Sequence, residues 1–242
     1  IKKEIQSNND TMTSPNKEKI KNNYKAKGIP KLHSFVADNI NFFLVMEHAG
    51  LDLFDHIKKC HEMIRDKKLD INKYLRHVKV LFKQMVNIVH YIHDVKYVCH
   101  MDISLENFTI KNFKINNGNI INHGTIYMID FGLAEYFGKN SSYLCQKHVG
   151  KVKYQSPKLY HKYKFNAKLN DCWSLGVCLF LMHIGNHPYE IPSNNDDCFY
   201  NIINGYAKPL LIDSNKSKYI NDEFIDLIKN TLTYEHKRYF IS

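Results

Sequence analysis

The chain has 242 residues, of which 44% are hydrophobic and 24% are charged, and its formal net charge is +10. This length allows one substantial core, or two lobes that share a cleft. No apolar run reaches the roughly 18 residues that a membrane span needs, so we expect no transmembrane segment. The positive charge would suit nucleic acid, an anionic membrane face or an acidic substrate. The lysines are scattered, however, which favours a solvated surface and no nucleic-acid partner.

The cysteines show no CxxC spacing. Cys172 and Cys178 fall in or beside the longest apolar run, Leu175 to Met182, which predicts a buried helix in which cysteine acts as a small hydrophobic residue. Reduced thiols therefore fit better than disulfides or a zinc site, and they indicate a reducing, cytosol-like compartment.

The first 31 residues are polar and weakly patterned. Ser14-Pro15-Asn16 predicts the start of a helix that runs through Tyr24 and ends at Gly28-Ile29-Pro30. Two strands are predicted next, at Leu32 to Val36 and at Phe42 to Met46.

Apolar residues then recur at steps of three and four from Leu75 to Ile92, which predicts a strong amphipathic helix. Thr109 to Ile115 and Ile120 to Ile129 alternate around an Asn-Asn-Gly-Asn turn, a pattern typical of a β-hairpin. We expect the polar residues of this arm to project into solvent. From Asp171 onward the pattern is mainly helical.

The most informative residues are His100-Met101-Asp102, Asn107 and Asp130-Phe131-Gly132. In this order they supply a proton acceptor, an amide metal ligand and a carboxylate metal ligand. Phosphoryl transfer needs little covalent chemistry from a protein, because positioning and charge neutralisation carry most of the catalysis. The segment around Asp102 resembles the catalytic loop of eukaryotic protein kinases, and Asp-Phe-Gly resembles their magnesium motif.

Further matches to protein kinases arrive in the family's order. Leu44 to His48 resembles a strand entering the hinge, and Asp52 follows where the family places a ribose-binding carboxylate. Gly150, Tyr154 and Ser156-Pro157 resemble the end of an activation segment. Asp171 to Gly176 resembles the start of the central C-lobe helix, and Lys237-Arg238-Tyr239 lies where the family places a late arginine. The chain thus resembles the protein kinase superfamily over nearly its whole length. The resemblance implies an α+β, bilobal fold in one monomeric catalytic domain, with the remainder of the N-lobe at 1–47, a hinge at 48–50 and the C-lobe at 51–242.

A narrower likeness lies at the first residues. Ile1-Lys2-Lys3 resembles the Phe-Ile-Lys-Lys signature of the FIKK kinases of apicomplexan parasites, and Ser104 in the catalytic loop is also FIKK-like. Membership would imply export into a host cell, although the chain contains no exporting sequence.

The resemblance assigns roles to the reacting groups. Asp102 is the expected base that orients the substrate hydroxyl and accepts its proton, and Asn107 and Asp130 are the expected ligands of Mg²⁺. Lys2 is the expected lysine on the α- and β-phosphates of ATP, with Lys3 as the alternative. Glu18 is its candidate partner by spacing, but Ile20 and Tyr24 suggest a helix with a different inward face.

The nucleotide pocket is assigned in the same way. Met46 is the expected gatekeeper, and Glu47 and His48 present hinge backbone to adenine. Thr109 stands where the family has an aliphatic floor, which predicts a more polar pocket. Asp52 is assigned to the ribose, with a helix N-terminal carboxylate as the alternative. The catalytic loop adds Glu106 to the cofactor site.

Two departures from the family pattern carry further predictions. Met101 replaces the arginine that receives an activation-loop phosphate, so activity is expected to depend little on phosphorylation of Ser141, Ser142 or Tyr143. Ser104 stands in place of a lysine and Lys151 in place of a threonine, a reciprocal exchange. Lys151 would then reach across Asp102 and supply the missing positive charge. The alternative is a solvent-facing lysine.

The expected function is ATP-dependent transfer of a phosphoryl group to a protein hydroxyl, of Ser or Thr. No Gly-rich loop is present in the sequence, so we assign the activity to a longer parent protein and expect the isolated chain to bind ATP poorly. A pseudokinase that serves as a binding scaffold is one alternative, and a small-molecule kinase of related fold is another.

Overall fold

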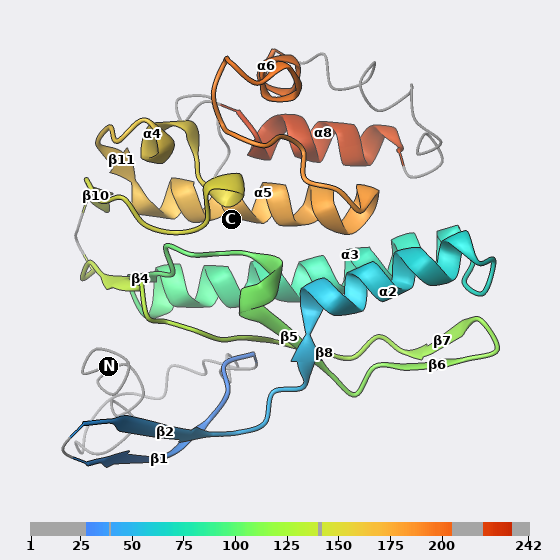
Figure 1. Ribbon diagram of the computed structural model, residues 1–242, viewed down its shortest axis with the longest axis horizontal. Coiled ribbons are helices and arrows are strands. Elements are labelled where there is room, and N and C mark those ends of the chain that lie inside the picture. The colour runs from blue at the N-terminus through green and yellow to red at the C-terminus, as the bar shows by residue number, and fades with distance from the viewer. Residues whose placement is uncertain (1–27, 39, 140–141, 205–219, 234–242) are drawn as a thin grey trace, which may run out of the picture.

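The computed structural model of the chain describes residues 28–38, 40–139, 142–204 and 220–233. The helix predicted over 14–24 lies outside these residues. Helices and strands are mixed, as expected for an α+β protein. Figure 1 shows the helices stacked in layers, with a ribbon of two strands extending from one side. Among the described residues, no helix combines the length and apolar character that crossing a membrane requires.

Three helices form the centre of the fold. They are α2 (Leu53–Arg65), α3 (Ile71–His90) and α5 (Ala167–Ile184). Each begins after a polar residue whose side chain accepts a hydrogen bond from a backbone N–H of the first turn. These N-cap residues are Asp52, Asp70 and Asn166. Helix α5 lies between α3 and α8 (Asp222–Thr231), and it ends at Gly185, whose φ of 84° favours glycine (Figure 1).

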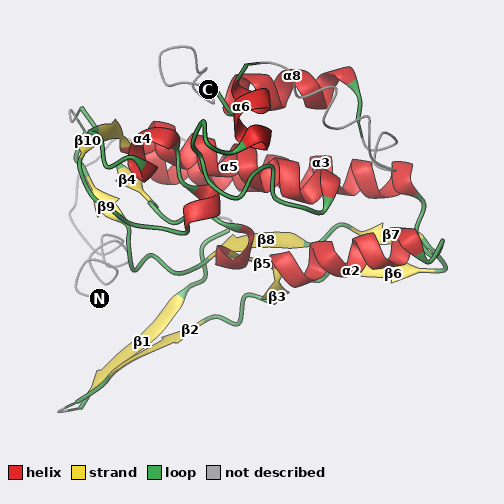
Figure 2. Cartoon of the chain, turned by 45° about the horizontal axis from the view of Figure 1, so that its top comes forward, coloured by secondary structure: helices red, strands yellow, loops and turns green. Residues whose placement is uncertain are grey.

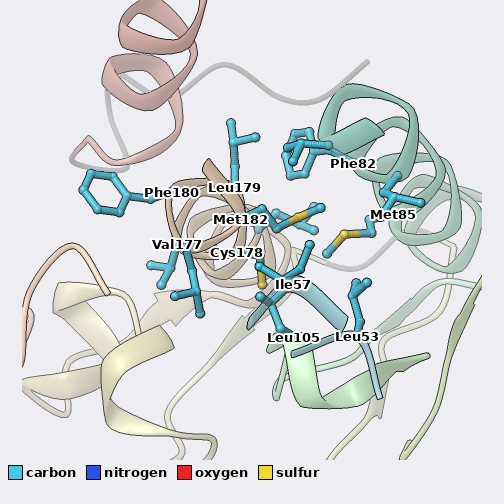
Figure 3. Packing of buried hydrophobic residues seen from close by; sticks show 14 of the residues in the cluster. Leu53, Ile57, Phe82, Met85, Leu105, Val177, Cys178, Leu179, Phe180 and Met182 are labelled. Carbon is cyan, nitrogen blue, oxygen red and sulfur yellow. The ribbon is translucent and has the colours of Figure 1, made fainter. Parts of the chain in front are cut away.

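Apolar side chains of these helices meet in one core, shown from close by in Figure 3. Leu53 and Ile57 of α2 lie together with Cys178 of α5, and all three are at most 2% exposed. Leu105, from the expected catalytic loop, is fully buried in the same cluster. Since burying an aliphatic side chain contributes about 1.5–3 kcal/mol, Leu105 ties that loop firmly to the helical core.

The strands are short and antiparallel. Strand β1 (Leu32–Ala37) pairs with β2 (Phe42–Met46), and β6 (Lys114–Asn116) forms a hairpin with β7 (Asn119–Asn122). A three-stranded sheet contains β3 (Leu51–Asp52), β5 (Phe108–Lys111) and β8 (Thr125–Met128). Two further pairs are β4 (Val98–Cys99) with β9 (Glu135–Tyr136) and β10 (Leu144–Cys145) with β11 (Phe165–Asn166). Figure 2 shows the β1–β2 ribbon apart from the other strands. The shorter helices are α4 (Pro157–Tyr160) and α6 (Asp197–Ile203).

Several predicted elements are confirmed. The two strands before the hinge are β1 and β2, the amphipathic helix is α3 followed by a π-helical turn at Tyr91–Val95, and the apolar run is the buried centre of α5. Each of the two long strands predicted for the hairpin is divided in two: the first becomes β5 and β6, and the second becomes β7 and β8. The division arises because β5 and β8 pair in one sheet, whereas β6 and β7 pair separately beyond it.

The polar residues of the arm formed by β6 and β7 are mostly exposed, as expected, but the arm also packs on the central helices. Ile115 and Ile120, one from each strand, pack against the main core, and Lys73 of α3 donates a hydrogen bond to Asn119 (2.6 Å). The arm lies along the central helices because its two isoleucines require an apolar neighbour (Figure 1).

Candidate active site

Asp171, on α5, anchors the expected catalytic loop. Its side chain is fully buried, and its two oxygens accept hydrogen bonds from the backbone N–H groups of His100 (2.7 Å) and Met101 (3.0 Å). The ring of His93 adds a third contact at 2.8 Å. Met101 has φ of 69°, a strained value for a residue with a side chain, and these hydrogen bonds stabilise it. Asp171 therefore anchors the backbone of the loop.

Asp102 follows this turn, and both of its carboxylate oxygens are held. The amide nitrogen of Asn107 donates to Oδ2 of Asp102 (3.0 Å) and to its backbone carbonyl (2.7 Å). The backbone N–H of Lys151 donates to Oδ1 (3.2 Å). An oriented, half-buried carboxylate at the end of a fixed loop is suited to accept a proton from a bound hydroxyl.

The Asp-Phe-Gly segment lies beside Asn107. The backbone N–H of Ile129 donates to the carbonyl of Asn107 (2.9 Å), which places Asp130 next to the catalytic loop. Asp130 is exposed and has φ of 60°. The ring of His100 is 5.1 Å from that of Phe131, so His100 supports this segment by packing.

The donor atoms of this region fit a magnesium ion. Hard cations prefer oxygen ligands, and the carboxylate of Asp130 is exposed to receive one. The amide nitrogen of Asn107 is turned toward Asp102, so the other end of the amide, its oxygen, is the atom that suits a cation. The three residues singled out from the sequence therefore meet in one region.

Lys151 reaches back to the catalytic loop. Its ammonium group donates to the hydroxyl of Ser104 (2.7 Å) and lies 3.7 Å from the carboxylate of Glu106. Glu106 also accepts a hydrogen bond from the hydroxyl of Tyr154 (3.2 Å). Lys151 is thus not a free solvent-facing lysine. Glu106, which was assigned to the cofactor site, contacts Lys151 and Tyr154, and its role toward the cofactor stays a prediction.

Gly150 makes this approach possible. Its φ is 80°, and a Cβ added to it would lie 2.8 Å from the carbonyl oxygen of Met101 and 3.3 Å from Oδ1 of Asp102. The backbone before Lys151 can therefore pass close to the catalytic loop only where the residue has no side chain.

The expected adenine and ribose contacts lie on and after β2. The side chain of Met46 is exposed, and Glu47 pairs with Lys111 (3.2 Å), whose hydrogen bond lowers the pKa of Glu47. The backbone of His48 continues the same segment toward β3. Asp52 accepts a hydrogen bond from the N–H of Asp55 (3.1 Å) as the N-cap of α2. The alternative role of Asp52 as a helix N-terminal carboxylate is therefore observed, and its ribose role stays a prediction.

The hydroxyl of Thr109 is engaged by the backbone. It donates to the carbonyl of Ala49 at 2.9 Å, and the residue is 7% exposed. This contact argues against the expected increase in pocket polarity, because the hydroxyl already has a partner in the hinge. Lys2 and Glu18 lie outside the described residues, so their assignments stay predictions.

Comparison with known proteins agrees with this geometry. The profile of the family described as protein kinase domain matches residues 1–240. The chain belongs to the protein kinase family.

Relatives of this kinase domain include three Ser/Thr kinases. The serine/threonine-protein kinase PSK2 of Saccharomyces cerevisiae is 28% identical over 218 residues, which cover 88% of the chain and 16% of that protein. The testis-specific serine/threonine-protein kinase 5 of Mus musculus is 30% identical over 69% of the chain and 41% of its own length. The serine/threonine-protein kinase CHK1 of S. cerevisiae is 30% identical over 65% of the chain and 27% of its length. The chain thus spans less than half of each of these relatives.

The activation segment of the kinase domain, taken here as 130–157, has an apolar anchor. Met101 is 1% exposed, and it belongs to a small cluster with Tyr143 of the activation segment. The other members are Cys99, Leu159, Phe165 and Ala167. An apolar side chain at position 101 therefore packs against the segment, in place of the charged pair that an arginine and a phosphate would form.

Two anchoring residues were not found by sequence reasoning. His93 contacts Asp171, and Lys168 lies 2.5 Å from Asp94 and 4.2 Å from the ring centroid of Tyr143. Burial alone would lower the pKa of Lys168, but the pair with Asp94 raises it. No motif marks either residue, because each acts on a partner about 25 to 80 positions away in the sequence.

Proposed function

We propose that the protein transfers the γ-phosphoryl group of Mg-ATP to a Ser or Thr hydroxyl of a protein substrate. The observation that carries the proposal is Asp102, whose carboxylate is held by Asn107 and by the backbone of Lys151 next to the Asp130 segment. The Ser/Thr kinases among the relatives support the same acceptor class.

In this proposal each residue has a separate task. Asp102 orients the acceptor hydroxyl and takes its proton as the oxygen attacks phosphorus. Asn107 and Asp130 hold Mg²⁺, which when bound neutralises the charge of the phosphates. Lys151 places a second positive charge beside the loop, and its hydrogen bond to Ser104 holds the ammonium group there. Lys2 grips the α- and β-phosphates, paired with Glu18.

The substitution Asp102→Asn tests the proposal because it keeps the shape of the side chain and removes its basicity. Transfer of labelled phosphate to an array of Ser- and Thr-containing peptides should fall by a factor of about 10² or more. Binding of Mg-ATP, measured by thermal shift, should be unchanged. If the unsubstituted parent protein bound Mg-ATP but labelled no peptide or protein, a pseudokinase scaffold would replace this proposal.

We further propose that the protein is a FIKK-type kinase that acts as a monomer in a reducing compartment of a host cell. The support is Ile1-Lys2-Lys3, Ser104 in the catalytic loop and six cysteines that form no disulfide bond. Imaging of the tagged parent protein in infected cells tests the location. A protein confined to the parasite, or to an oxidising compartment, would contradict it.

A further inference from the structure

Four metal-binding side chains meet on the side of α2 that faces α3. His56 and Cys60 lie one turn apart on α2, His77 projects from α3, and His123 follows β7. The Nε2 atoms of His56 and His77 are 2.9 Å apart, and the Sγ atom of Cys60 is 3.6 Å from Nε2 of His56. We call these four residues the His–Cys cluster.

The spacing of three of these atoms is close to that of a tetrahedral zinc site. One ring nitrogen of His56, one of His77 and the Sγ atom of Cys60 all lie within 4.8 Å of one another. Zn–N bonds of about 2.1 Å and Zn–S bonds of about 2.3 Å place tetrahedral ligands about 3.4 Å apart for N–N and about 3.6 Å apart for N–S. The distance of 3.6 Å between Sγ of Cys60 and Nε2 of His56 already equals the N–S value. The Nε2 atoms of His56 and His77, which are 2.9 Å apart, would have to separate by about 0.5 Å to reach the N–N value.

The surroundings hold the ligands in the orientation that a metal requires. Nδ1 of His77 is 2.9 Å from Nδ1 of His123, so the proton of the His77 ring can lie on this side and leave Nε2 free to coordinate. The ring of Phe113 lies 4.5 Å from that of His56 and 5.0 Å from that of His77 and forms an apolar wall. Cys60 is 2% exposed and His77 is fully buried.

Protonation also favours coordination by the rings. Burial lowers the pKa of His56 to about 4 and that of His77 to about 3, so both are neutral at neutral pH. Burial raises the pKa of Cys60 to about 12, but a bound cation displaces the thiol proton.

We propose that the His–Cys cluster is a binding site for a zinc ion with three protein ligands. Nε2 of His56, Sγ of Cys60 and Nε2 of His77 form three bonds to Zn²⁺, the Cys60 proton passes to solvent, and water takes the fourth position. His123 orients His77 and does not coordinate. The ion would join α2 to α3, while the contact of His123 with His77 would hold the segment after β7 beside it, and the role of the ion is independent of phosphoryl transfer.

The first experiment adds Zn²⁺ alone to the chain after dialysis into metal-free buffer. Elemental analysis should find one zinc per chain, and a chelator should lower the midpoint of thermal unfolding. Loading with Co²⁺ should produce the near-ultraviolet absorption of a thiolate–cobalt bond. Zinc absent from the saturated chain would overturn the proposal, as would a cobalt spectrum without the thiolate band, because the metal would then be held by other histidines.

Matched variants locate the site. Cys60→Ser should abolish the thiolate band, whereas Cys198→Ser, which changes an exposed cysteine, should leave it intact. His56→Gln changes a side chain that is only partly buried, and it should remove stoichiometric binding while the circular dichroism stays unchanged. His123→Ala should weaken the metal affinity about tenfold to a hundredfold. Unchanged zinc affinity in Cys60→Ser and His56→Gln would refute the assignment. Asp102→Asn should bind zinc normally, which separates this test from that of the proposed function.

Discussion

The contact between Lys151 and Ser104 gives the sharpest prediction for catalysis. Replacing Lys151 by alanine removes an ammonium group that is bonded to the catalytic loop at 2.7 Å and is 41% exposed. Two unit charges about 4 Å apart interact with about 1 kcal/mol in water and about 4 kcal/mol near a protein surface. Glu106, 3.7 Å away, offsets part of this field. We therefore expect a loss of about 1.4–2.7 kcal/mol of transition-state stabilisation, or about tenfold to a hundredfold in kcat.

The assay is steady-state phosphorylation of a peptide by the parent protein, with kcat and KM measured separately. Lys153→Ala is the matched control, because Lys153 lies in the same segment and pairs with Glu190 away from the loop (2.6 Å). The double substitution Ser104→Lys with Lys151→Thr moves the amine and the hydroxyl to opposite sides and should restore part of the lost kcat. If Lys151→Ala kept full kcat while Asp102→Ala lost it, the reasoning would be wrong.

Three more predictions follow from buried groups. Treatment with phosphatase should leave turnover unchanged, because Met101 packs on Tyr143 without a phosphate; a loss of kcat in a labelled-phosphate assay would contradict this. Asp171→Ala leaves two buried backbone N–H groups without partners, and each such group costs about 1–3 kcal/mol. Urea unfolding should therefore show that the free energy of unfolding falls by about 2 kcal/mol or more. A fall of less than about 1 kcal/mol would exclude the anchoring role. Burial, helped by His61 and opposed by Glu223, lowers the pKa of His183 to about 4. Because the unfolded chain binds this proton near pH 6.5, His183 alone should lower stability by up to about 3 kcal/mol between pH 6.5 and pH 4. His183→Leu should therefore lose less stability over that range in urea titrations, and equal losses in both proteins would refute this.

Local patterns were sufficient to predict the elements that position the catalytic loop. The steps of three and four in α3 reflect which face of the helix is buried, and neighbouring residues in the sequence carry this pattern. The contact of Lys151 with Ser104 was also predictable, because two departures from one family pattern were complementary in chemistry.

Contacts between distant segments were not predictable in this way. The engagement of Thr109 by Ala49 depends on how β5 meets the hinge, 60 residues away in the sequence. The His–Cys cluster joins residues from two helices and a loop, and no CxxC spacing marks it in the sequence. One signal was visible: His56 and Cys60 are four residues apart, which places them on one face of a helix.

The apolar anchor of the activation segment affects how the proposed activity could be switched off. A segment held by a phosphate can be released by a phosphatase while the rest of the molecule stays folded. Here Tyr143 is held by packing next to Met101, in a cluster that continues into β11 and α5. Melting of the segment and melting of the domain should therefore coincide, so a heated sample would lose activity and tertiary structure along a single curve.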